Sequence, residues 1–260
     1  MENIDFTDIA KRNRMAEKIL KRKIAETIRL QRPKVKIIRL GNKKVKVAFG
    51  GYGVLNTKFG KFYLCLFHIN DKWKEYQVVI RAEEKARKFI FKKPHILFRI
   101  DSGCYTSVYG DRTCDCREQL FNSMAKIAEY GEGIIICIGT QEGRGLGMEF
   151  KLGTLMLQDK FKLNTIEAFL LLSNFQKIEA REYSNIPAIL KFLGIGPEKT
   201  IDLMTNNPAK INSLVRYGYT VNRAPSTIKP NKFTEKHLRS KAHSLKHTIT
   251  EDAPNLKPLT

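Results

Sequence analysis

The sequence predicts an α/β (α+β) fold in which helices pack on a mixed sheet and a basic helix extends from the N-terminal end. Three observations predict this fold. Short runs of β-branched and aromatic residues follow one another between residues 35 and 100. Apolar segments of helix and strand length alternate from residue 116 onward, and an amphipathic stretch rich in Lys and Arg precedes both regions.

The N-terminal stretch predicts a basic amphipathic helix over residues 10–31. It ends before Arg32-Pro33, because proline disfavours the helical conformation in the residue before it. Five strands are expected next, separated by Gly, Asn and charged turns. They cover Val35–Leu40, Val45–Phe49, Phe62–His68, Tyr76–Ile80 and His95–Ile100. We interpret this half of the chain as an antiparallel or mixed sheet.

From Cys116 onward the pattern alternates between helix and strand. Helices are expected at 117–130, 144–159, 165–175, Arg181–Leu193 and Pro208–Tyr217, and strands at Gly133–Ile138, Thr200–Met204 and Tyr219–Asn222. This order favours parallel or mixed pairing, with functional residues at the strand ends. The tail after Pro225 contains His237, His243 and His247, and we expect it to be loosely held.

The chain is strongly basic, with 47 Lys/Arg against 26 Asp/Glu in 260 residues. The excess lies at the ends: residues 1–46 hold 15 basic and five acidic side chains, and residues 224–260 hold seven and three. Such a surface attracts nucleic acid, acidic membranes or polyphosphate ligands, and lysines on solvated faces are the alternative interpretation. No apolar run approaches the ~20 residues that span a bilayer, so we expect a cytoplasmic protein without a membrane partner.

Three of the five cysteines cluster in the run from Cys104 through Cys114 to Cys116. A structural zinc normally takes four protein ligands, whereas a catalytic zinc takes three and leaves one position for a reactive water. The trio therefore suggests an open metal site. A disulfide plus a free thiol, or a closed site completed by a distant His, remain alternatives. The other two, Cys65 and Cys137, lie in apolar strand runs and are expected in the core.

Two loops could bind an anion. The run Gly139–Gly147 follows a buried strand and opens a helix, so its backbone N–H groups and Arg144 could meet a negative group. In the second loop, Thr205 and Lys210 flank Asn207-Pro208, which suit the N-cap and the first helical position. An ordinary strand-to-helix connection would explain either loop equally well.

Taken together, the motifs resemble the GTP cyclohydrolase II family over about residues 55–222. The stretches that carry the resemblance occur in family order. They are Thr57–Phe62, Arg99–Cys104, Cys114–Leu120, Gln141–Gly147, Leu157–Asp159, Thr165–Ala168, Arg181–Tyr183 and Thr205–Lys210. The expected organisation is a basic helical extension at 1–33, a catalytic domain with a GTP cyclohydrolase II-like fold at 34–223, and a basic tail at 224–260.

The resemblance implies a zinc enzyme that opens the imidazole ring of GTP and releases pyrophosphate, acting in riboflavin biosynthesis as a homodimer. By resemblance, Cys104, Cys114 and Cys116 hold one Zn²⁺, and Mg²⁺ accompanies the nucleotide phosphates. The positions that match nucleotide-binding residues are Arg99, Ser102, Gln119, Glu142, Gly143, Arg144, Thr165, Thr205 and Lys210. Arg181 matches the arginine with a nucleophilic role at the α-phosphorus, and Glu179 falls where the family has an acidic proton acceptor.

The sequence also departs from the family. Before the first zinc cysteine the family has His-Ser-Glu, whereas this chain has Asp101-Ser102-Gly103, and its loop from Cys104 to Cys114 is one residue shorter than is typical. The catalytic tyrosine of the family aligns with Leu155, which can neither donate nor accept a proton.

Three hypotheses follow from these departures. The enzyme opens the ring of GTP and stops at a formamidopyrimidine product, or it is a paralogue that acts on a related purine nucleotide. In the third, it is a non-catalytic zinc protein whose basic N-terminal helix binds nucleic acid.

Overall fold

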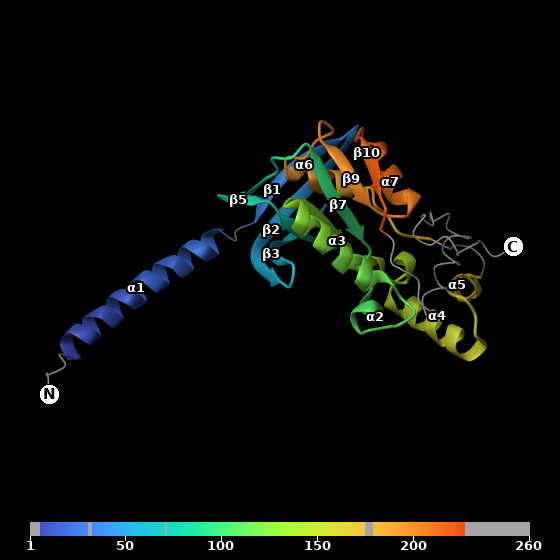
Figure 1. The fold of residues 1–260 in the computed structure, drawn as a ribbon, viewed down its shortest axis with the longest axis horizontal. Coiled ribbons are helices and arrows are strands. Elements are labelled where there is room, and N and C mark those ends of the chain that lie inside the picture. The colour runs from blue at the N-terminus through green and yellow to red at the C-terminus, as the bar shows by residue number, and fades with distance from the viewer. Residues whose placement is uncertain (1–5, 31–32, 71, 175–178, 227–260) are drawn as a thin grey trace.

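An eight-stranded sheet organises the molecule, and a long helix stands away from it (Figure 1). The structure is a computed structural model that describes residues 6–30, 33–70, 72–174 and 179–226. Its first half comprises α1 (Phe6–Leu30), β1 (Lys34–Leu40), β2 (Lys43–Thr57), β3 (Gly60–Ile69), β4 (Lys72–Arg81), β5 (Glu83–Lys85), β6 (Lys88–Ile90) and β7 (His95–Asp101).

The second half alternates helices and strands, as the sequence predicts. It comprises α2 (Tyr105–Val108), α3 (Cys116–Tyr130), β8 (Gly133–Cys137), the 3-10 segment η1 (Gly139–Gly145), α4 (Met148–Phe161), α5 (Thr165–Leu172), α6 (Ile186–Phe192), β9 (Thr200–Met204), α7 (Pro208–Val215) and β10 (Val221–Ala224).

The strand order is β1-β2-β3-β4-β8-β7-β9-β10, and β5 pairs with β6 in a separate hairpin. Strands β1 to β4 form an antiparallel meander, and β8 joins β4 in the antiparallel sense. From β8 onward the neighbouring strands β7, β9 and β10 are parallel. The mixed-sheet α/β class predicted from the sequence is confirmed.

The central strands are buried on both faces, which explains their nearly unbroken apolar sequences. Successive side chains of a strand point to opposite faces, so Ile134 and Ile136 join the larger core with α6 and α7. Ile135, between them, packs with Met124 and Ile127 of α3 in a second core. Helices thus cover both faces of the parallel half of the sheet.

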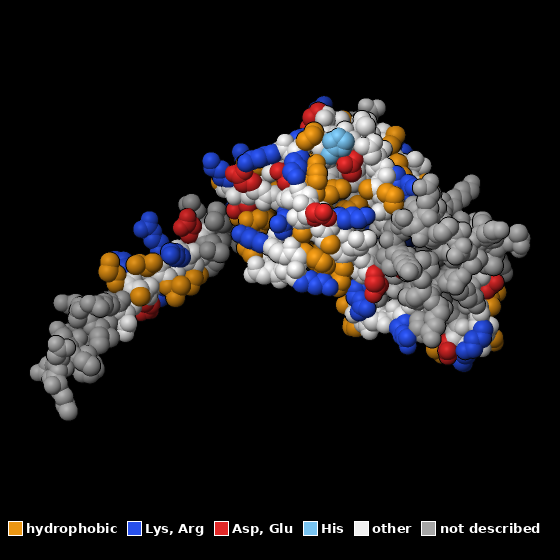
Figure 2. All heavy atoms as spheres, viewed as in Figure 1, with side chains coloured by type: hydrophobic (Ala, Val, Ile, Leu, Met, Phe, Trp, Pro, Cys, Tyr) orange, Lys and Arg blue, Asp and Glu red, His pale blue; other side chains and the backbone are white. Residues whose placement is uncertain are grey.

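Helix α1 makes no comparable core. Between residues 13 and 26 its side chains are exposed, including the apolar Met15, Ile19, Leu20 and Ile24 (Figure 2). The expected helix is confirmed, and it begins earlier than predicted, at Phe6. Among the described residues, no helix is both long and apolar enough to cross a membrane.

One predicted helix is wrong in its first part. The sequence suggests a helix over Arg181–Leu193, but α6 begins only at Ile186, after the N-cap Asn185 and next to Pro187. The preceding segment is extended, because Arg181 folds back onto Glu179 through its backbone and its guanidinium. The expected helix at 144–159 likewise starts later, at Met148, because Gly143 and Arg144 adopt left-handed conformations.

Smaller differences concern element ends and short elements. The predicted strands at residues 45–49, 62–68 and 76–80 are longer, because their hairpin ladders extend into the turns. The short elements β5, β6 and α2 were not expected. The histidine-containing tail lies beyond residue 226 and so outside the described residues, and the expectation for it stays a prediction. The domain boundaries also remain predictions.

The carboxyl ends of β7, β8 and β9 meet at one edge of the sheet. Asp101 at the end of β7 pairs with Cys137 at the end of β8, and Phe98 of β7 pairs with Leu203 of β9. Parallel α/β sheets place ligands at this edge. The loops that follow β7, β8 and β9 leave from it, and they carry Ser102, Cys104, Cys114, Glu142, Gly143, Arg144 and Thr205. Thr165 opens α5 instead, and Glu179 and Arg181 lie between α5 and α6.

A glycine sets the distance between α3 and the sheet, and this yields a test. A Cβ atom on Gly133 would lie 2.7 Å from Ile127 Cγ1 and 2.8 Å from the Leu97 carbonyl oxygen. We expect Gly133→Ala to lower the free energy of unfolding by about 1–3 kcal/mol through overpacking. Gly53→Ala in β2 is the control, because a Cβ atom there meets nothing within 4 Å. Urea denaturation measures both variants, and equal effects would contradict this account of the packing.

Candidate metal centre and anion site

The three predicted cysteine ligands come together in space. Cys104 precedes α2, Cys114 lies in the loop that follows, and Cys116 is the first residue of α3. Their sulfur atoms all lie within 4.8 Å of one another, and the Sγ atoms of Cys104 and Cys114 are 3.6 Å apart. Two thiolates on a tetrahedral zinc, with Zn–S bonds of about 2.3 Å, would be about 3.8 Å apart. The donor set therefore fits a zinc ion.

All five cysteines are free thiols, so the disulfide alternative is not what the structure contains. Hydrogen bonds from Cys114 and Cys116 lower the pKa of Cys104, and the shared hydrogen bond with Cys104 raises the pKa of Cys114. The arrangement therefore favours a thiolate at Cys104, and a thiolate is the form that ligates metals. Within the described part of the chain, neither a histidine nor a carboxylate joins the three sulfurs as a fourth ligand.

The departure at Asp101 and Gly103 has a structural explanation. One carboxylate oxygen of Asp101 accepts the Gly103 N–H at 3.0 Å, and the other accepts two N–H groups of Arg99 at 3.0 and 2.9 Å. Asp101 is therefore bound to Arg99 and is not a member of the cysteine cluster. Gly103 has a φ of +61°, and a Cβ atom on it would lie 3.0 Å from Gly139 Cα. A glutamate at this position would force the two loops apart.

Glu142 ties the glycine-rich loop to the metal centre. Its buried carboxylate accepts the backbone N–H of Tyr105 at 2.8 Å, directly after Cys104. Lys151 lies 3.8 Å from the other carboxylate oxygen. Gly143 and Arg144 follow with φ values of 56°, a left-handed conformation that is uncommon for arginine. The loop is thus held beside α2, and this conformation directs Arg144 inward.

Arg144 and Arg181 form a buried cationic pair. The Arg144 guanidinium lies 4.8 Å from the centre of the Phe169 ring. Burial, with a contribution from the charge of Arg181, lowers its pKa to about 10. Arg181 donates to Glu179 at 2.7 Å. Burial alone would raise the pKa of Glu179, but Arg181 outweighs it and lowers that pKa. Glu179 therefore holds Arg181 in place as an ionised partner.

Lys210, at the start of α7, is a further buried cation. Its Nζ donates to the Ile100 carbonyl oxygen at 2.7 Å. Burial, followed by the charges of Arg99 and Arg181, lowers its pKa to about 7. Close by, Thr205 Oγ1 accepts the backbone N–H of Asn207 at 3.0 Å. The mutual repulsion of these cations would be relieved by an anion placed among them.

Several buried polar atoms in the same region have no hydrogen-bond partner in the described chain. They are Ser102 Oγ, Gln141 Oε1, Arg144 NH1 and Tyr183 OH. The Ser102 and Tyr183 hydroxyls lie near each other without hydrogen-bond geometry. Buried polar groups are rarely left unpaired, so these atoms point to a missing ligand or solvent. The sequence analysis identified Ser102 and Arg144 as candidate site residues. It assigned no role to Gln141 or Tyr183, although both lie in stretches that resemble the family.

A pocket of about 400 Å³ opens next to the cysteine cluster, and its wall is largely apolar. Its lining includes Gln77, Cys104, Tyr105, Cys116, Phe121 and Cys137. Gln119 lies behind it, where its Oε1 accepts a hydrogen bond from Arg99 at 3.2 Å. A flat ring fits a wall of this kind, with the cations beyond it available for charged groups.

Thr165 and Leu155 lie on the two helices that follow the glycine-rich loop. Thr165 opens α5 after the capping residue Asn164 and is half-buried, on an element that carries none of the three cysteines. Leu155 is half-buried on α4. No carboxylate cluster for a second metal occurs in the described residues, so the Mg²⁺ site remains a prediction.

Several known proteins are similar to this chain in sequence. A protein "GTP cyclohydrolase-2" from Campylobacter hominis is 37% identical over 202 residues, which is 76% of this chain and 93% of that protein. A "GTP cyclohydrolase-2" from Picrophilus torridus is 33% identical over 195 residues, or 74% and 94% of the two chains. A "Riboflavin biosynthesis protein RibBA" from Endomicrobium trichonymphae is 35% identical over 197 residues, or 75% of this chain.

The matches differ in how much of each relative they cover. The chain spans only 46% of the length of the Endomicrobium RibBA protein, and 45% of that of a RibBA protein from Phocaeicola vulgatus. The profile of the family described as GTP cyclohydrolase II matches residues 53–225, which include the cysteine cluster, the glycine-rich loop and the buried cations. The chain belongs to the GTP cyclohydrolase II family.

Proposed function

We propose that this protein is a zinc-dependent hydrolase that opens the imidazole ring of GTP and releases pyrophosphate. The observation that carries the proposal is the position of a cluster of three thiols beside a largely apolar pocket, next to buried, mutually repelling cations. A purine ring and a polyphosphate suit these two halves of the site.

Cys104, Cys114 and Cys116 would hold the zinc ion, which when bound supplies a Lewis acid and lowers the pKa of a water to about 7. Glu142 fixes the backbone beside Cys104, and Asp101 fixes Arg99 and Gly103. These residues keep the metal centre and the pocket in a constant relation. Their role is positional, because their carboxylates are already bound to the protein.

Arg144, Arg181 and Lys210 would bind the triphosphate. Their charges lie in a buried region, where electrostatic attraction to phosphate is stronger than in water. Phosphate would also bind the free N–H group of Arg144 and restore the proton affinity of Lys210. By resemblance to the family, Arg181 is the nucleophile toward the α-phosphorus and Glu179 its proton acceptor. Mg²⁺ would accompany the phosphates, and a homodimer is expected.

The product of the reaction depends on a position at which this chain departs from the family. Leu155 stands on α4 where the family has a tyrosine, and a leucine moves no proton. We propose that ring opening proceeds and that the second hydrolysis, which releases formate, is slow. A related purine nucleotide as substrate is the second candidate, and the specific observation in its favour is the close Gly103–Gly139 packing beside the pocket. Nucleic acid binding by α1 stays a prediction.

The first test concerns the product. Incubation of the zinc-loaded protein with GTP and Mg²⁺ should yield pyrophosphate and an accumulating formamidopyrimidine nucleotide, detected by mass spectrometry. Leu155→Tyr should raise formate release by about a hundredfold, the low end of what a general acid or base contributes. Leu152→Tyr, on the exposed side of α4, is the control. Formate and pyrophosphate in equal amounts from the unchanged protein would contradict the arrested reaction, and unchanged GTP would contradict the proposed substrate.

The second test concerns the metal. Cys104→Ser should lower bound zinc to well below one per chain and reduce GTP turnover at least about 10³-fold, because a metal-generated nucleophile is lost. Cys65→Ala, in the distant core of β3, should retain zinc and turnover. Metal analysis and turnover are measured on the same preparations. Full zinc content in the Cys104 variant would exclude that sulfur as a ligand.

The third test uses the lowered pKa of Lys210. Between pH 7 and the usual lysine pKa of about 10.4, the unfolded chain binds more protons than the folded chain, so Lys210 makes stability rise with pH. Below pH 7 its burial cost is fully present. Lys210→Met should therefore raise the free energy of unfolding at pH 7 and flatten its increase toward pH 10, while GTP binding is lost.

Chemical denaturation at pH 7, 8 and 9 tests this expectation, with the exposed Lys160→Met as the control. If Lys210→Met lowered the free energy of unfolding at pH 7 and left its dependence on pH unchanged, the burial of Lys210 would not destabilise the folded protein.

A further inference from the structure

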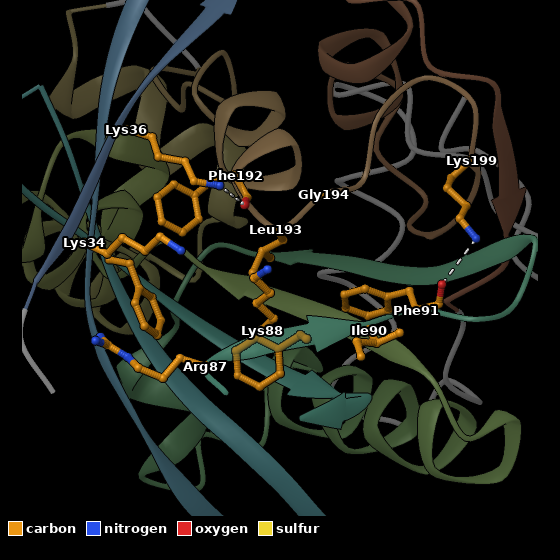
Figure 3. A pocket seen from close by; sticks show the side chains of 12 residues that line it. Lys34, Lys36, Arg87, Lys88, Ile90, Phe91, Phe192, Leu193, Gly194 and Lys199 are labelled. Atoms are coloured by element: carbon orange, nitrogen blue, oxygen red, sulfur yellow. Dashed lines mark hydrogen bonds between the residues drawn. The ribbon is translucent and has the colours of Figure 1, made fainter. Parts of the chain in front are cut away.

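A second pocket lies away from the metal centre, at the antiparallel end of the sheet. It has a volume of about 360 Å³ and is enclosed by β1, β2, the β5–β6 hairpin and the end of α6 (Figure 3). None of its lining residues lines the pocket beside the cysteines. Nothing in the proposed reaction uses it. Its volume falls in the range of about 300–1,000 Å³ typical of small-molecule sites.

Aromatic rings form much of its wall. Phe49, Phe89, Phe91 and Phe192 line it, together with Ile90 and Leu193. The centroids of Phe49 and Phe192 are 6.2 Å apart with an interplanar angle of 33°, and Phe49 is fully packed against Phe67 beneath. Phe49 and Phe89 are buried and form the base of the pocket, whereas Phe91 and Phe192 are half-buried. Because the core holds the Phe192 ring in place, the pocket offers a preformed aromatic surface against which a planar ring can pack.

The rim is exclusively cationic among its charged residues. Lys34, Lys36, Arg87, Lys88 and Lys199 line the pocket, and no Asp or Glu does. Lys36 Nζ lies 4.6 Å from the centre of the Phe192 ring and 3.4 Å from the Phe192 carbonyl oxygen (Figure 3). Burial, followed by the charges of Lys34 and Lys88, lowers the pKa of Lys36. The lysines are thus close enough to repel one another.

We propose that this pocket binds a small planar aromatic compound that carries a phosphate group, at a site separate from the proposed GTP site. The ring packs against the half-buried Phe192, and the phosphate is held by Lys34, Lys36 and Lys88. The aromatic wall alone would suit any apolar ligand, and the cationic rim alone would suit any anion. Only a compound with both parts uses the whole pocket, and the simplest general probe of that kind is a mononucleotide.

The test is calorimetric titration of zinc-loaded protein with adenosine 5′-monophosphate (AMP). Lys88→Glu should weaken AMP binding by at least about tenfold, because it reverses a charge on the rim. Lys85→Glu is a matched control: it pairs with Lys88 across the same hairpin, is exposed and does not line the pocket. Phe192→Leu should also weaken binding, while adenosine and inorganic phosphate should each bind more weakly than AMP.

Two further arms separate this site from the reaction. Lys210→Met, which disables the proposed GTP site, should leave AMP binding unchanged, and Lys88→Glu should leave GTP turnover unchanged. Equal losses in the Lys85 and Lys88 variants would overturn the proposal, as would AMP binding that depends on Lys210 and not on Lys88. So would a 12-nucleotide oligoadenylate that binds at least about a hundredfold tighter than AMP and depends on Lys88, because the occupant would then be a nucleic acid strand.

Discussion

The loops that follow β7 and β8 lie in close contact at the carboxyl edge of the sheet, and the candidate site depends on that contact. Gly103, after β7, packs against Gly139, after β8, and neither residue has a side chain to separate the backbones. This contact brings Cys104 and Tyr105 close to Glu142, whose carboxylate accepts a hydrogen bond from the Tyr105 N–H. Because β7 and β8 are parallel neighbours in fixed register, the loops leave the sheet side by side. The same contact therefore positions both the cysteine cluster and the glycine-rich loop.

The same edge gathers a set of cations that the fold stabilises only in part. Asp101 compensates Arg99, and Glu179 compensates Arg181, whereas the acceptor for the buried Lys210 within the described part of the chain is the Ile100 backbone carbonyl. The lowered pKa of Lys210 expresses the cost of this arrangement. A site that stores uncompensated positive charge is less stable when empty and binds phosphate more strongly when filled. The buried N–H group of Arg144 without a partner belongs to the same pattern.

The sequence predicted the mixed sheet because its signals are local. Alternating or unbroken apolar runs indicate strands, and Pro, Gly and Asn residues mark their ends. It failed at Arg181–Tyr183, where apolar spacing suggested a helix. The ion pair with Glu179 and the hydrogen bond from the Ala180 N–H to the Arg144 carbonyl oxygen hold that segment in a non-helical conformation. The Ala180–Arg144 hydrogen bond joins loops that lie far apart in sequence, and periodicity carries no information about it.

The site divides in the same way. Cysteine spacing alone suggested an open three-ligand metal site, and loop patterns suggested Arg144 and Lys210 as anion-binding cations. Family motifs supplied Arg99 and Arg181. The roles of Asp101 and Tyr183 could not be predicted, because one is defined by hydrogen bonds to Arg99 and Gly103 and the other by a buried hydroxyl near Ser102. The aromatic, cationic pocket beside Phe192 was also not predicted. Its residues come from four separate segments that only the folded sheet brings together.

The central claim is that three cysteines hold a zinc ion and leave its fourth position open to the substrate pocket. Zinc X-ray absorption spectroscopy of the loaded protein, with and without GTP, tests this claim most directly. The account predicts three sulfur ligands at about 2.3 Å and one oxygen or nitrogen ligand, with a change in the light-atom ligand when GTP is added. Four protein ligands that do not change with GTP would mean a closed, structural zinc and would contradict the account.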